Sequence, residues 1–216
     1  ITPGVEDKFF QHQAHDDIRS ALGINGKSVI YTIARLDERK GQDMMIKALS
    51  IIKKRFPDVI YLIGGIGPRM EFLKNLVLQE NVSENVIFLG LIPEEKIVAY
   101  HHLGDIFVQP NRTLDDGDTE GFGIVFLEAN AAGKPVIAGN AGGAVDAVVD
   151  GVTGFLVNPL DPNEIAEKIC ELLSNKIKAD RLGKQGQQRA KNEFRWPVLS
   201  KKFEDEITYF SKTKFD

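Results

Sequence analysis

The sequence predicts an α/β fold, a doubly wound parallel sheet of the Rossmann-like kind with helices on both faces. Short runs of apolar residues alternate along the chain with longer segments of helical periodicity. Strands that are apolar throughout are buried on both faces, which is typical of parallel sheets covered by helices. Regular alternation of strand and helix, joined by right-handed crossovers, produces a doubly wound domain. Ligands of such domains bind beyond the carboxyl ends of the strands, so a site is expected in the loops that follow them.

Each strand is predicted from a short run rich in Val, Ile, Leu and Phe, and each helix from apolar residues that recur at helical spacing. The predicted strands are residues 29–34, 59–63, 86–89, 105–108, 135–138 and 154–157. The predicted helices are residues 41–56, 70–81, 94–102, a central helix from about 124, and then 143–149, 162–174, 179–192 and 197–210. The first of these helices, for example, places Met45, Leu49 and Ile52 on one face. No internal repeat or low-complexity segment interrupts this order.

Composition indicates an ordinary globular protein without a strong electrostatic field. The 216 residues are enough for one sizeable domain or two small ones, and their content of 43% apolar and 27% charged residues is ordinary. The formal net charge of −4 offers no basic field to nucleic acid, so any phosphate binding has to be local. The single cysteine, Cys170, excludes an internal disulfide and suits a reducing compartment. The histidines are not spaced with cysteines or acids as metal ligands are, so no metal site is predicted.

The sequence has no stretch that approaches the ~20 apolar residues of a membrane-spanning helix. We therefore expect a cytoplasmic protein without direct membrane insertion, with the full-length protein at most peripheral at a membrane. Residue 1 is Ile rather than Met, which indicates a piece of a longer chain or a processed product.

The centre of the predicted site is the segment from Glu120 to Glu128. Gly121 and Gly123 allow the backbone to approach a ligand closely. A helix that begins near Ile124 directs its free amides and the positive end of its dipole toward an anion. Glu120 then lies in the loop ahead of these amides and Glu128 about one turn into the helix. A ligand held here has to offer both phosphate and hydroxyl groups, as a nucleotide sugar does; the alternative is a helix whose acids simply face water.

Three further loops follow predicted strands. Arg35 and Lys40 lie after the first strand, where the planar fork of Arg and the mobile charge of Lys suit phosphate oxygens, although a basic loop is often only solvated. The turn after the second strand contains Gly65 and Gly67, which permit close approach but are also needed by a tight turn. The residues after the third strand include Leu91 and Ile92, for which a plain strand and turn is the alternative.

Taken in this succession, the motifs resemble the C-terminal, donor-binding domain of family 4 of the retaining glycosyltransferases with the two-domain GT-B fold. The family signature Glu-x7-Glu stands here as Glu120 and Glu128. The basic loop resembles the family's Gly-Arg-Leu…Lys-Gly clamp, with Ala34 in place of Gly, and Gly65 to Pro68 resembles its Gly-x-Gly-Pro turn. A further departure is Asp146, where the family commonly has Glu. The resemblance covers essentially the whole chain.

The resemblance implies hexosyl transfer from a nucleoside-diphosphate sugar with retention of anomeric configuration and without a cofactor. GDP-mannose is favoured as donor, with a UDP-sugar next. Glu120 would hold sugar hydroxyls near the developing cation, and Glu128 would hold the ribose hydroxyls. Arg35, Lys40 and the amides around Phe122 to Ile124 would stabilise the leaving diphosphate. Gly65, Gly67, Gly121 and Gly123 would admit the donor, and Leu91 and Ile92 would contact the nucleobase.

The same resemblance predicts that the chain is divided into three segments. Residues 1–27 would be an interdomain linker, residues 28–195 the donor-binding domain, and residues 196–216 a C-terminal helix that reaches toward an absent N-terminal domain. We expect part of an aromatic stripe near this helix to be exposed; its members are Phe194, Trp196, Leu199, Phe203, Ile207 and Phe210. Because closure of two domains completes such a site, the fragment is expected to be inactive or weakly active alone.

Three other interpretations stay open. A glycosidase also uses paired carboxylates but has no need of a phosphate clamp. A sugar-nucleotide epimerase of GT-B fold would interconvert donors without an acceptor. A non-catalytic nucleotide-sugar-binding module would bind the donor and remain inactive even when joined to an N-terminal domain.

Overall fold

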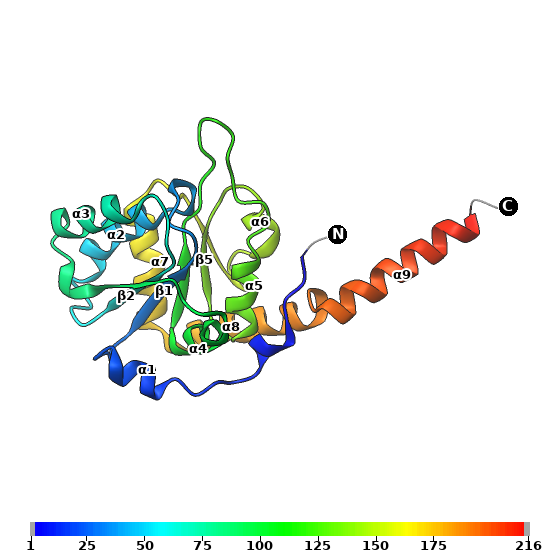
Figure 1. Ribbon diagram of the computed structural model, residues 1–216, viewed down its shortest axis with the longest axis horizontal. Coiled ribbons are helices and arrows are strands. Elements are labelled where there is room, and N and C mark those ends of the chain that lie inside the picture. The colour runs from blue at the N-terminus through cyan, green and yellow to red at the C-terminus, as the bar shows by residue number, and fades with distance from the viewer. Residues whose placement is uncertain (1–2, 214–216) are drawn as a thin grey trace.

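A computed structural model of the chain describes residues 3–213, except for the side chains of residues 210–213. It confirms the predicted doubly wound parallel sheet (Figure 1). The strands are β1 (Val29–Ile33), β2 (Ile60–Gly64), β3 (Val86–Gly90), β4 (Ile106–Gln109), β5 (Val136–Gly139) and β6 (Gly154–Val157). They form one sheet in the order β3-β2-β1-β4-β5-β6, and every neighbouring pair is parallel. The order reverses between β1 and β4, so a ligand crevice is expected beyond their carboxyl ends.

Helices cover both faces of the sheet and follow the predicted alternation with small shifts. They are α1 (Asp16–Ala21), α2 (Gln42–Ile52), α3 (Met70–Gln79), α4 (Glu94–Leu103), α5 (Ile124–Ala131), α6 (Ala144–Ala147), α7 (Pro162–Ser174), α8 (Lys176–Glu193) and α9 (Trp196–Thr213). Short 3-10 turns are η1 (Asp7–Phe10), η2 (Glu38–Lys40) and η3 (Ser83–Asn85). Successive strand residues point to opposite faces of a sheet. Accordingly, Ile30 packs in the core beneath α2, α3 and α7, whereas Tyr31 packs in the core beneath α4, α5 and α6.

Two helix boundaries differ from the prediction for local reasons. Helix α2 ends at Ile52 rather than near residue 56; residues 53–55 are turns, and Pro57 disfavours a helical conformation in Phe56. Helix α8 begins at Lys176 rather than at residue 179, because the Asn175 side chain accepts a hydrogen bond from the Lys178 amide at 2.9 Å and so caps the helix.

The N-terminal segment contains η1 and α1, for which the sequence pattern gave no signal. Arg19 holds α1 in place by donating to the carbonyls of Leu103 at 2.8 Å and Lys27 at 2.6 Å. Such a helix is specified by tertiary contacts rather than by its own periodicity. The predicted boundaries at residues 27 and 195 stay predictions.

The start of the chain and the start of α9 are bound to each other. Val5 N donates to the carbonyl of Phe194 at 2.8 Å, and the Arg195 guanidinium donates to both carboxylate oxygens of Asp7 at 2.7 and 2.6 Å. Beyond this contact α9 projects away from the body of the protein (Figure 1). Within the predicted aromatic stripe, Phe194 is buried. As expected for part of the stripe, Trp196, Phe203 and Ile207 are exposed, Leu199 is half-buried and the Phe210 side chain lies outside the described residues.

Residues 3–213 contain neither a membrane-spanning helix nor a metal-binding cluster. None of the helices in this part of the chain is both long enough and apolar enough to cross a membrane. The same residues contain no group of three or more His, Cys, Asp and Glu side chains placed to hold a metal ion.

Candidate functional site

The loops that follow β1 and β4 meet at the switch point of the sheet. The amide of Arg112, after β4, donates to the carbonyl of Arg39, after β1, at 2.9 Å. The Arg112 guanidinium also donates to both carboxylate oxygens of Asp43 at 3.1 and 3.0 Å, and both side chains are largely buried. A buried bidentate pair of this kind has a fixed geometry. It therefore holds the start of α2 and the loop after β4 in one arrangement.

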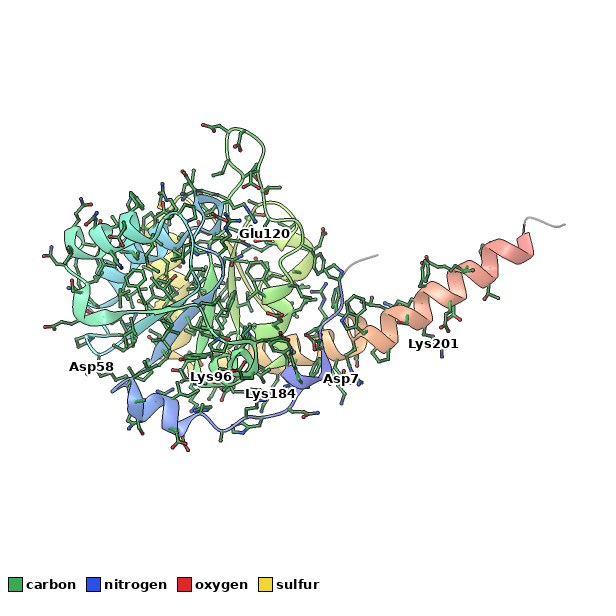
Figure 2. The ribbon with its side chains drawn as sticks, viewed as in Figure 1. Asp7, Asp58, Lys96, Glu120, Lys184 and Lys201 are labelled. Atoms are coloured by element: carbon green, nitrogen blue, oxygen red, sulfur yellow. The ribbon has the colours of Figure 1, made fainter. Side chains whose placement is uncertain are left out.

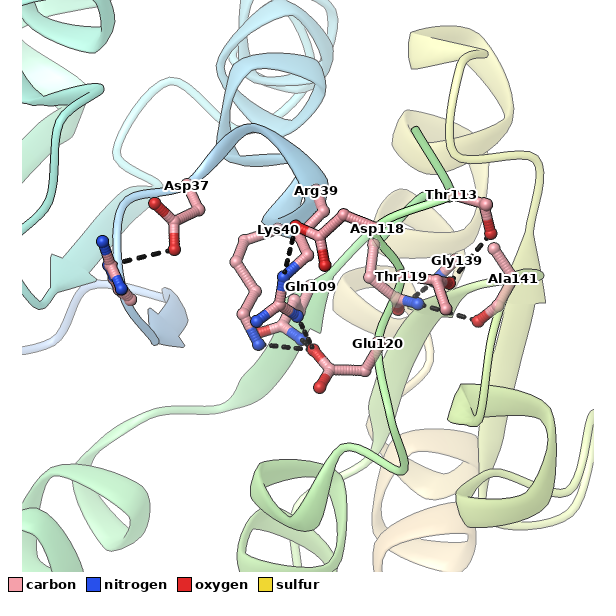
Figure 3. Close-up of polar contacts among 12 residues, drawn as sticks. Asp37, Arg39, Lys40, Gln109, Thr113, Asp118, Thr119, Glu120, Gly139 and Ala141 are labelled. Atoms are coloured by element: carbon pink, nitrogen blue, oxygen red, sulfur yellow. Dashed lines mark hydrogen bonds and ion pairs between the residues drawn. The ribbon is translucent and has the colours of Figure 1, made fainter. Parts of the chain in front are cut away.

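Glu120 is at the centre of this meeting point (Figure 3). Its Oε2 atom accepts from Lys40 Nζ, from Gln109 Nε2 at 3.1 Å and from Arg39 Nη1 at 3.4 Å. The residue is only 8% exposed, and a buried carboxylate needs such partners. Figure 2 shows Glu120 at the foot of the projecting loop, at the opposite edge of the sheet from Asp58. The Glu120 cluster, defined as Glu120, Lys40, Arg39 and Gln109, thus gathers two cations at the carboxyl edge of the sheet.

Arg35 lies apart from this cluster. Its Nε atom pairs with Asp37 Oδ2 at 3.1 Å, and 71% of the side chain is exposed. In Figure 3 the Asp37 carboxylate lies well to the side of Glu120. Lys40 is the last residue of the short turn η2, whereas Arg35 lies before this turn begins. The two basic residues predicted to act together therefore border different parts of the crevice.

Arg35 borders an apolar cleft of about 530 Å³, called the apolar cleft below. Its walls come from the last residue of β1, from the loops after β1, β2 and β3, and from α4: Ile33, Ala34, Arg35, Gly65, Ile66, Gly67, Leu91, Ile92 and Ile97. A Cβ atom on Gly65 would lie 1.9 Å from the carbonyl oxygen of Ala34, so the close packing of these loops requires glycine there. The predicted residues Gly65, Gly67, Leu91 and Ile92 are thus brought together. A cleft with this lining suits a flat, weakly polar group.

A second cleft of about 450 Å³ contains both members of the Glu-x7-Glu pair and is called the glutamate cleft below. It is lined by Pro3, Gly4, Glu6, Glu120, Phe122, Gly123, Ile124, Glu128 and Trp196. Helix α5 begins at Ile124, as predicted, and Gly123 precedes it in the left-handed conformation with φ 79°. Among the described residues no side chain caps this helix start, which leaves amides for an anion. Gly121 is exposed, and no atom lies within 4 Å of the position its Cβ would take.

Glu128 has surroundings unlike those of Glu120. Its side chain is 23% exposed, and its Oε2 atom lies 3.7 Å from Nε2 of His101. His101 is on α4 and fully buried, and its Nδ1 atom lies 3.0 Å from the Tyr31 hydroxyl. Sequence analysis did not place His101 in the site, since nothing in the spacing of residues 101 and 128 indicates that they meet.

Other residues missed by the sequence analysis are Arg39, Gln109 and Asn111. Arg39 is adjacent to Lys40 in the basic loop, and Gln109 is the polar last residue of an otherwise apolar strand, so both had a local signal. Asn111 binds the loop after β4 to β5: it donates to the carbonyl of Ala141 at 2.9 Å and accepts from the amide of Gly139 at 3.2 Å. Its role depends on strand order and had no signal in the sequence.

Comparison with known proteins agrees with this architecture. The model of the family "Glycosyl transferases group 1" matches residues 14–189, and the chain belongs to this family. It resembles the crystal structure of the C-terminal domain of the group 1 glycosyl transferase LpcC from Francisella tularensis. The TM-score is 0.78 at 27% identity, with 89% of this chain and 100% of that chain covered. The fold is therefore the C-terminal half of a GT-B fold.

Two other comparisons concern whole proteins. The chain is 39% identical over 199 residues to a GDP-mannose-dependent alpha-(1-6)-phosphatidylinositol monomannoside mannosyltransferase of Mycolicibacterium smegmatis, covering 91% of this chain and 52% of that protein. It also matches the structure of Anabaena HepE in complex with UDP and glucose, with a TM-score of 0.84, 25% identity and coverage of 95% and 55%. The chain spans about half the length of the curated relatives it matches.

Proposed function

We propose that this chain is the donor-binding half of a retaining glycosyltransferase, which binds a nucleoside-diphosphate sugar and takes part in transfer of its hexosyl group to an acceptor. The observation that carries the proposal is the Glu120 cluster. In this cluster Lys40 and Arg39 contact Glu120, which lines the glutamate cleft, and they follow closely after Arg35, which lines the apolar cleft. An anion bound at this point has a flat binding surface on one side and carboxylates for hydroxyl groups on the other.

The donor is assigned to these parts by chemistry. The nucleobase lies in the apolar cleft against Leu91 and Ile92, and Arg35 at its border faces the diphosphate. The diphosphate lies against Lys40 and the amides of residues 122–124. Sugar hydroxyls bind Glu120, and ribose hydroxyls bind Glu128. A carboxylate accepts hydrogen bonds from hydroxyl groups, which fits both assignments.

Donor binding changes the partners of Glu120. In the free protein its carboxylate accepts hydrogen bonds from Lys40 and Arg39. A diphosphate carries more negative charge than one carboxylate and competes for these cations. Glu120 is then released toward the sugar hydroxyls. The cluster thus keeps the cations ordered until the donor arrives.

The same groups account for the transfer step. As the bond between the sugar and the phosphate breaks, negative charge grows on the leaving diphosphate. Lys40, Arg39 and the amides at the start of α5 stabilise that charge more in the transition state than in the ground state. Glu120 lies where positive charge develops on the sugar, and the leaving phosphate receives the acceptor's proton. The acceptor binds to an N-terminal domain, so the isolated chain is expected to transfer slowly or not at all.

GDP-mannose is the first donor to test and a UDP-sugar the second. The Mycolicibacterium relative is named as GDP-mannose-dependent, and the HepE structure contains UDP and glucose. Both relatives therefore support a nucleoside diphosphate, and the higher sequence identity supports the guanine nucleotide.

The test is calorimetric titration of this chain with GDP, UDP and ADP in metal-free buffer. We expect micromolar binding of one diphosphate and about 10- to 100-fold weaker binding by Lys40→Ala, because a hydrogen bond to a charged group contributes about 1.5–3 kcal/mol. Lys54→Ala is the matched control, since Lys54 is an exposed lysine beyond the far end of α2. Equal affinity in both variants would contradict the proposed clamp, and failure of the full-length protein to bind any of the three would contradict donor binding itself.

A further inference from the structure

His101 has an unpaired nitrogen in the interior of the protein. The residue is fully buried, and its Nε2 atom has no hydrogen-bond partner among the described residues. The nearest charged oxygen is Oε2 of Glu128 at 3.7 Å, on the wall of the glutamate cleft. A buried polar atom without a partner lowers the stability of a folded protein and is uncommon. The position of this nitrogen close to Glu128 therefore indicates a functional role.

The other ring nitrogen indicates which atom carries the hydrogen. Burial raises the pKa of Tyr31 well above its usual value, with the negative charges of Glu128 and Asp105 adding to the effect. The Tyr31 hydroxyl therefore keeps its proton and can donate it to Nδ1 of His101, 3.0 Å away. In a neutral imidazole an accepting Nδ1 leaves the hydrogen on Nε2. The opposite tautomer would leave the Tyr31 proton unpaired and turn a lone pair toward the Glu128 carboxylate.

The imidazole ring is also fixed in place. Phe9 and Tyr31 meet it edge to face at centroid distances of 5.5 Å each, and Phe107 lies 6.1 Å away. Glu128 is partly exposed and more free to adjust. A shift of its carboxylate by about 0.8 Å would bring Nε2 and Oε2 to the usual hydrogen-bond distance of ~2.9 Å.

We propose that His101 is a positioning residue: its Nε2–H holds one oxygen of the Glu128 carboxylate, so that the other oxygen faces the ribose hydroxyls of a donor in the glutamate cleft. This inference rests on the proposed function. It explains why an imidazole is buried between aromatic rings at this point. It also connects α4 to the glutamate cleft through Glu128, although no residue of α4 within the described part of the chain lines that cleft.

The first experiment requires no donor. The nitrogen shifts of the histidine rings of this chain, labelled with ¹⁵N, report the tautomer. We expect His101 to be the Nε2–H tautomer and its ring signals to move in Glu128→Gln. An Nδ1–H tautomer, or signals indifferent to Glu128→Gln, would overturn the proposal even if no nucleotide binds.

The second experiment compares the affinity of this chain for GDP with that for 2′,3′-dideoxy-GDP, or for the corresponding pair of another base if the first titration selects it. We expect the wild type to prefer the ribonucleotide and Glu128→Gln to lose the preference. His101→Leu should reduce the preference about three- to tenfold, and His101→Gln, which offers an N–H near the same place, should restore most of it. A ratio of affinities is insensitive to a general loss of stability.

His12→Leu is the control for this comparison, because His12 is an exposed histidine outside the site. An unchanged ratio in His101→Leu, together with its loss in Glu128→Gln, would overturn the positioning role and leave donor binding intact. If no nucleoside diphosphate binds the wild type, donor binding fails instead, and the tautomer experiment alone decides the contact between His101 and Glu128.

Discussion

The two glutamates of the Glu-x7-Glu segment have the same side chain but lie in different environments. Glu120, in the loop after β4, is surrounded by Lys40, Arg39 and Gln109. Glu128, eight residues later on α5, faces the buried imidazole of His101, which is set among aromatic rings. The negative charge of Glu120 is compensated by two cations, whereas Glu128 has an imidazole nitrogen as its nearest partner. The motif therefore does not assign a role to its glutamates; the loops and helices that pack around each one do.

The most direct way to separate the two environments is Glu120→Gln in the full-length protein. We expect turnover to fall about 100- to 1,000-fold, the scale of losing one group that stabilises charge in a transition state. Binding of the nucleoside diphosphate should be kept or tightened, because Lys40 and Arg39 lose a competing carboxylate. Product formation and calorimetry measure the two effects, with Glu71→Gln on the exposed surface of α3 as control. A parallel loss of binding and turnover would show that Glu120 does not compete with the diphosphate.

A second variant, Gly41→Ala, tests the meeting of the loops that creates the Glu120 environment. Gly41 has φ 74°, and a Cβ atom there would lie 2.0 Å from the carbonyl oxygen of Pro110. We expect a loss of about 2–4 kcal/mol in the free energy of unfolding, from backbone strain and overlap together. Gly23→Ala is the matched control, since Gly23 has φ 66° but open space around it, and should cost about 1 kcal/mol.

Denaturant unfolding measures both glycine variants. Diphosphate affinity should fall in Gly41→Ala, whereas the preference for ribose over dideoxyribose should persist, because the Glu128 environment is built by α4 and α5. Equal destabilisation by the two variants would mean that the two loops do not constrain each other.

The smallest expected effect concerns the pH dependence of stability and arises from α4, the helix that carries His101. Burial lowers the pKa of His102, the neighbour of His101 on α4, to about 4, with the Lys134 charge as a further cause. The unfolded chain binds this proton more readily than the folded one, so stability is lost as the pH falls from about 6.5 toward 4. His102 is 8% exposed, and the loss between pH 7 and 4.5 should be about 2 kcal/mol. The free energy of unfolding at pH 7, 5.5 and 4.5 measures this loss. If its dependence on pH were unchanged in His102→Gln, the acid sensitivity would come from another group.

Much of the fold could be predicted from local patterns. Each apolar run became a strand of the parallel sheet, and α5 begins at Ile124 as its glycines indicated. The prediction was poorest where the signal was not local. Helix α1 depends on Arg19, which donates to the distant carbonyl of Leu103. Arg35 pairs with Asp37 whereas Lys40 pairs with Glu120, although the two basic residues are close in sequence.

For the candidate site, the sequence by itself determined the chemical groups and the edge at which they gather. Strand periodicity and the loops after each strand place Lys40 and Glu120 at the carboxyl edge of the sheet, because all parallel strands end there. Only the tertiary structure decided which of these side chains contact each other. The reversal of strand order puts β1 beside β4 and so joins Lys40 to Glu120, and the packing of α4 against β1 and α5 brings His101 to Glu128. Periodicity records which residues are buried, but contacts between residues far apart in sequence depend on how the whole sheet is wound.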